Sequence, residues 1–132
     1  MNGFNNTCVP VEEKVDIQLV EAYQREVAEI LKSSNAIFQL WSLDWTSDRF
    51  LNEFRHTIQI LQNRSHIAGF VNIEEVAGAV LSVLDAVISG KAKAIIVTET
   101  LHRALEVMTY LFAQIQKDSR KKDRPRKLTL IR

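Results

Sequence analysis

The chain has 132 residues, 46% hydrophobic and 25% charged, which fits one globular domain with an apolar core. The formal net charge of +1 hides an asymmetry, because residues 117–132 hold eight of the 17 basic residues and two of the 16 acidic ones. The first 116 residues therefore carry nine basic and 14 acidic residues, a formal charge of −5. This distribution excludes a uniformly basic nucleic-acid-binding surface.

Membrane insertion and export are not expected from this sequence. No stretch reaches the roughly 18 uncharged apolar residues that a membrane span needs. The first residues lack the basic region and apolar run of a signal peptide. The lone Cys8 cannot form an internal disulfide, so a reducing, cytoplasmic location is expected.

The first part of the chain divides into a polar segment and a helix. Residues 1–14 are mostly polar and without hydrophobic period, so we expect a disordered N-terminal segment. From Ile17 onward, apolar residues recur at steps of three and four, which predicts an amphipathic helix to about Leu40, capped by Asp16. In the loop that follows, we expect Trp41 and Trp45 to form a hydrophobic lid on the bundle end.

A second helix is predicted to begin at Thr46, Ser47 or Asp48 and to end at Gly69. Its apolar residues, again at steps of three and four, are Phe50, Leu51, Phe54, Ile58 and Leu61. At about 100° per residue, His56 lies opposite this stripe, Gln59 and Asn63 share its face, and His66 lies on the flank.

Two further helices complete the expected fold. The third is predicted from an Asn72 cap to residues 89–91, which contain Gly90. The fourth is predicted from Ala94 or Thr98 to Gln116, with the β-branched residues 94–97 opening the helix rather than forming a strand. Short loops between helices imply an all-α, antiparallel up-down four-helix bundle.

Residues 118–132 form a basic tail or linker. They lack the interleaved aromatic residues that stack on bases, so a nucleic-acid partner is not expected. The three histidines and Cys8 are not spaced as metal ligands, and His102 is interpreted as a boundary residue of a packed helix. Phosphate-binding glycine loops and nucleotide fingerprints are missing from the sequence, so we expect no metal and no cofactor.

Three landmarks resemble the histidine phosphotransfer (Hpt) domain found at the N-terminus of chemotaxis-type histidine kinases. They are residues 54–58 (FRHTI), Gly69-Phe70, and residues 83–91 (VLDAVISGK), and together the resemblance covers about residues 15–117. It implies a bundle of four or five helices without an ATP-binding site. The implied partners are a response-regulator receiver domain, a histidine kinase, or both, in a two-component signalling system.

The resemblance also implies a working site on the second helix. His56 becomes the candidate phosphoacceptor, relaying a phosphoryl group to or from a receiver. The candidate docking face around it consists of Arg55, Gln59, Ile60, Asn63 and His66.

The acceptor motif departs from the family pattern, in which the histidine is followed by Lys at +3, Gly at +4 and Gly-Phe ten residues on. Counted from His56, the Lys and Gly positions hold Gln59 and Ile60. Counted back from Gly69, the acceptor position is Gln59 itself, with Gln62 and Asn63 in place of Lys and Gly.

These departures leave three readings open. The chain is a divergent relay domain that uses His56, a degenerate Hpt-like bundle that acts in docking or dimerisation, or a plain helical interaction protein. Of these three, only the relay domain would take part in phosphoryl transfer. All three are compatible with a homodimer.

Overall fold

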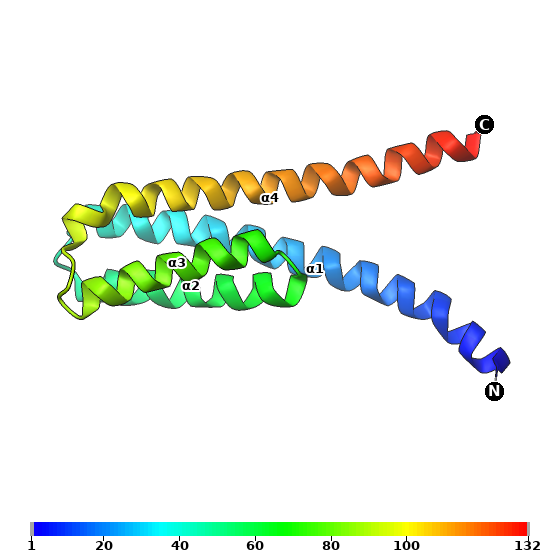
Figure 1. The fold of residues 1–132 in the computed structure, drawn as a ribbon, viewed down its shortest axis with the longest axis horizontal. Helices are drawn as coiled ribbons and strands as arrows, with labels where there is room; N and C mark the ends of the chain where they lie inside the picture. Colours follow the sequence, from blue (N-terminus) through cyan, green and yellow to red (C-terminus); the bar gives the residue numbers. More distant parts are fainter. Residues whose placement is uncertain (1, 132) are drawn as a thin grey trace.

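The computed structural model describes the backbone of residues 2–131 and the side chains of residues 18–118. Its helices are α1 (Asn2–Ser42), α2 (Asp48–Ala68), α3 (Val71–Ile88) and α4 (Ala94–Ile131). Each helix runs antiparallel to the one before it, and α4 packs back against α1, closing the bundle (Figure 1). The predicted all-α four-helix bundle is thus confirmed, and residues 2–131 hold neither a strand nor a fifth helix.

The outer helices differ in length from the sequence expectation. The backbone of α1 begins at Asn2 rather than near Asp16, and α4 continues past Gln116 to Ile131. The side chains of residues 1–17 and 119–132 lie outside those the structure describes, so the division into 1–14, 15–117 and 118–132 stays a prediction. Residues 94–97 open α4, as predicted. Among the described residues, no helix is both long and apolar enough to cross a bilayer.

The start of α2 is fixed by a side-chain cap. Ser47 is the N-cap, and its hydroxyl accepts a hydrogen bond from the backbone N–H of Phe50 at 3.2 Å. Just before it, the Asp44 carboxylate accepts hydrogen bonds from the hydroxyl and the backbone N–H of Thr46. These bonds, chiefly that from the hydroxyl, lower the pKa of Asp44. The turn between α1 and α2 is therefore stabilised by hydrogen bonds among its own residues.

The connection between α2 and α3 uses a left-handed glycine. Gly69 has φ of 79°, its N–H bonds to the carbonyl of His66 at 3.1 Å, and the Phe70 N–H bonds to that of Ser65 at 2.8 Å. The predicted Asn72 cap is wrong: α3 begins at Val71, after Phe70 at the cap position, with no side-chain cap bond. The Phe70 ring is buried at this turn, and α3 begins at the next residue.

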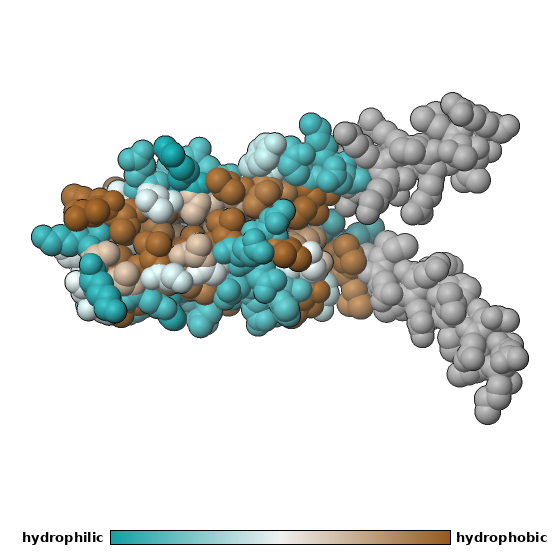
Figure 2. Space-filling view, in the orientation of Figure 1, coloured by the Kyte–Doolittle hydropathy of each residue, from teal (hydrophilic) through white to brown (hydrophobic). Residues whose placement is uncertain are grey.

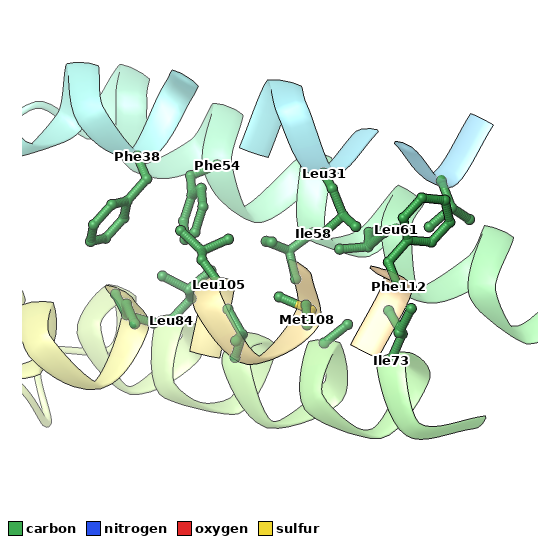
Figure 3. Packing of buried hydrophobic residues seen from close by; sticks show 14 of the residues in the cluster. Leu31, Phe38, Phe54, Ile58, Leu61, Ile73, Leu84, Leu105, Met108 and Phe112 are labelled. Atoms are coloured by element: carbon green, nitrogen blue, oxygen red, sulfur yellow. The ribbon is translucent and has the colours of Figure 1, made fainter. Parts of the chain in front are cut away.

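The core lies where the apolar stripes of all four helices meet, and Figure 3 shows these side chains pointing toward one another. Its largest fully buried members include Trp41, Phe54, Ile58, Leu61, Ile73, Leu84, Leu101, Leu105 and Met108. Trp41 and Trp45 close one end as predicted, with ring centroids 4.9 Å apart. His102 is more exposed than expected: its ring approaches Phe38 from outside the core, and its Nε2 lies 3.2 Å from Glu106 Oε1.

We predict that Gly69→Ala lowers the free energy of unfolding by about 1 kcal/mol, because an L-residue resists the left-handed conformation. Space is not the cause, since nothing lies within 4 Å of the added Cβ. Gly78→Ala is the control inside a helix: it should raise stability by up to about 1 kcal/mol through helix propensity. There the Cβ comes 3.0 Å from the movable end of Gln62. Urea unfolding measures the stability of both variants. Changes of the same sign and size would contradict the role given to the left-handed conformation of Gly69.

Candidate functional site

The candidate site is the outward face of α2, whose orientation is set by the residues it buries. Leu51, Phe54, Ile58, Leu61 and Ser65 face the interior. On the opposite side, His56, Gln59, Asn63 and His66 are all exposed. We call these four residues the α2 polar stripe. The stripe predicted from helical periodicity therefore exists, and both of its histidines are open to solvent.

His56 and Arg55 have different surroundings although they are adjacent in the chain. No hydrogen bond or ion pair joins the His56 side chain to another residue within 18–118, so its imidazole is free to meet a partner. Arg55 is only about one-third exposed, and its Nε lies 2.8 Å from Asp85 Oδ1 on α3. The guanidinium is therefore directed along the α2–α3 contact, away from His56, and does not supply a free positive charge on the stripe.

The C-terminal end of the stripe is tied to neighbouring helices. His66 Nδ1 lies 2.9 Å from Glu74 Oε2 in the first turn of α3. On the other flank, Arg64 Nε lies 2.8 Å from Glu26 Oε2 of α1. Arg64, beside the stripe, and His66, at its end, thus each lie next to a carboxylate of a neighbouring helix. Both pairs are partly exposed, so each adds little to stability.

A shallow depression of about 520 Å³ lies beside this end of the stripe. Its lining consists of Gln59, Gln62, Asn63, His66 and Glu74, so every lining residue carries a polar group. Gln62 reaches over Gly78, where a Cβ would meet its amide nitrogen at 3.0 Å. The missing side chain at Gly78 therefore leaves room for Gln62 between α2 and α3. Amide, imidazole and carboxylate groups of this kind can exchange hydrogen bonds with a partner surface.

Ile60 does not belong with this face. It is half-buried and lines a separate groove between α1 and α2, together with Ile30 and Arg64. The structure therefore brings Gln59, Asn63 and His66 to one depression, places His56 one turn toward the N-terminus, and separates Ile60 and Arg55 from them.

Sequence reasoning did not include Gln62, Glu74 or Asp85 in the site. Periodicity placed Glu74 in the first turn of the third helix, but which residue of α2 it meets depends on the rotation of two packed helices. The small Gly78 inside α3 was the available signal for a close contact between these helices. Within residues 18–118, acids, histidines and cysteines form no group able to hold a metal ion.

Comparison with protein-family models, with curated proteins and with solved structures gives no match for this chain. The geometry of the α2 polar stripe and the sequence landmarks are therefore the grounds on which a function is proposed.

We predict that Arg55 and Asp85 are coupled by about 0.5 kcal/mol in a double-mutant cycle of Arg55→Ala and Asp85→Ala. The pair is partly exposed, so its contribution is small and should shrink in 1 M salt, where screening acts within about 3 Å. Urea unfolding of the four proteins at two salt concentrations measures this. Zero coupling at low salt would show that Arg55 is not held by Asp85 in solution.

Proposed function

We propose that this chain is an Hpt-like bundle of a two-component signalling system that docks on a response-regulator receiver domain or a histidine kinase through the α2 polar stripe. The observation that carries the proposal is the exposed polar face of α2 within an antiparallel four-helix bundle, in the segment that holds the Phe-Arg-His and Gly-Phe landmarks. A cytoplasmic location, where such partners act, belongs to the same proposal.

The geometry favours docking over phosphoryl transfer. At the position ten residues before Gly69 stands Gln59, whose amide cannot accept a phosphoryl group as an imidazole does. Cations that would stabilise the phosphoryl charge are also engaged elsewhere, since Arg55 pairs with Asp85 and Arg64 with Glu26. We therefore infer that the bundle binds its partner without carrying the phosphoryl group.

Phosphorelay through His56 is the second candidate, and the exposure of this imidazole supports it. In that reaction, a phosphoryl group leaves the acyl phosphate of a receiver aspartate and bonds to a ring nitrogen. The unprotonated ring nitrogen attacks the phosphorus atom, and the P–O bond to the aspartate breaks as the N–P bond forms. The aspartate leaves as a carboxylate, and the proton on the other ring nitrogen can pass to solvent. Solvent and a partner protein can both reach His56, so access does not exclude this reaction.

A binding experiment tests the docking face. Gln59→Arg places a long charged side chain at the centre of the stripe, so it should weaken binding of a receiver domain from the same organism about tenfold or more. Gln39→Arg on α1 is the matched control, because Gln39 is also an exposed helical glutamine but lies on another helix. Titration calorimetry with each receiver of the organism measures the affinities. Equal affinity of both variants would place docking elsewhere.

A phosphotransfer experiment separates docking from relay. The chain and its His56→Gln, His66→Gln and Gln59→His variants are each mixed with radiolabelled phospho-receivers and active kinases. We expect no acid-labile label on the parent and a gain of label on Gln59→His, because that change puts an imidazole at the acceptor position. Label on the parent that disappears only in His56→Gln would instead establish the relay through His56.

A further inference from the structure

A second surface of the bundle lies on the seam between α3 and α4, away from the α2 polar stripe. Between Glu75 and Asp85, α3 contains no charged residue, although Ala79 and Ser82 are exposed. A surface helix of a monomer normally carries charges along its outer side. Figure 2 shows hydrophobic residues gathered along this seam, in the orientation in which α3 lies below α4.

The seam contains an open groove of about 450 Å³. Its apolar lining comes from Val76 on α3 and from Ile96, Ala104 and Val107 on α4. Ile96 is 72% exposed and Val107 is 41% exposed, so both leave apolar surface in water. A partner that buried these side chains would gain about 25 cal/mol of binding free energy for every Å² of apolar surface removed from solvent.

The charges of this groove are complementary to themselves. Glu99 and Arg103 also line it, are both more than three-quarters exposed, and lie 3.6 Å apart within α4. An antiparallel two-fold axis near residues 101 and 102 of α4 would set Glu99 of one copy beside Arg103 of the other. The same axis would bring Ile96 of one copy near Val107 of the other, because these positions lie five and six residues on either side of residue 101.

We propose that the α3–α4 seam binds a second copy of this chain, forming a symmetric antiparallel dimer through α4. An isologous interface requires one patch to complement itself, and this groove does so in both charge and apolar contacts. The 18 residues of α3 extend about 27 Å, and two helices side by side are about 20 Å wide, a footprint of about 540 Å² before side chains interdigitate. The two footprints together come to about 1,080 Å², just above the ~1,000 Å² that a specific interface should bury.

This assignment leaves the α2 polar stripe uncovered and does not depend on the proposed function. A receiver or kinase on the stripe and a second copy on the seam would occupy different faces of the bundle. Failure of one proposal therefore does not decide the other.

Sedimentation equilibrium of the full chain at concentrations up to about 1 mM tests the dimer. We expect the parent to dimerise, and Val107→Glu to abolish dimerisation by placing a carboxylate in the apolar contact. Leu43→Glu is the control, because Leu43 is 82% exposed at the end of the bundle outside the seam. Circular dichroism confirms that each variant keeps the helical fold.

A charge-reversal experiment identifies the axis. Glu99→Arg and Arg103→Glu each produce like charges across the two-fold axis. An exposed ion pair contributes up to about fivefold to an association constant. Loss of the two symmetry-related pairs should therefore weaken self-association about 25-fold. A mixture of the two variants restores opposite charges and should form a heterodimer. A monomeric parent, reversed variants that dimerise like the parent, or a mixture that does not associate would each overturn the proposal. A foreign helix bound at the seam of a monomeric parent would give this surface a different occupant.

Discussion

The structure depends on burial of one stripe of α2. Phe54, Ile58 and Leu61 are completely withdrawn from solvent at the centre of the bundle, each in contact with residues of other helices (Figure 3). Truncating a buried Phe or Ile typically costs several kcal/mol, so α2 cannot rotate about its own axis without losing most of the stability of a small domain. This constraint fixes which side chains remain outside, and with them the α2 polar stripe.

Helix periodicity was enough to predict most of the fold. Steps of three and four gave the four helices. The cap-forming residues 46–48 gave the start of α2 to within two residues, and Gly69 gave its end. The start of α3 was missed because the chain buries Phe70 at the turn instead of capping with Asn72. Local propensity favoured the asparagine, whereas packing of the aromatic ring decided the boundary, and packing is not visible in a short window of sequence.

The site was predictable in part for a similar reason. Angles around a single helix placed His56, Gln59 and Asn63 outward, because that estimate needs only the direction of the core. The contacts between residues of different helices could not be predicted from angles around one helix. Arg55 meets Asp85 thirty residues away, and Ile60 turns toward α1, because the axial rotation and separation of packed helices decide such contacts. The polar depression could not be derived from the sequence of α2 alone, since Glu74 of α3 completes it.

A signalling partner is proposed to contact the outward face of α2. The most direct measurement is an NMR titration of the isotope-labelled chain with unlabelled receiver domains, following each backbone amide. We expect the chemical-shift changes to concentrate over residues 56–66 and at neighbouring Glu74, while the amides of the α3–α4 seam stay unchanged. Shifts confined to other helices, or none with any receiver or kinase of the organism on a folded chain, would contradict it.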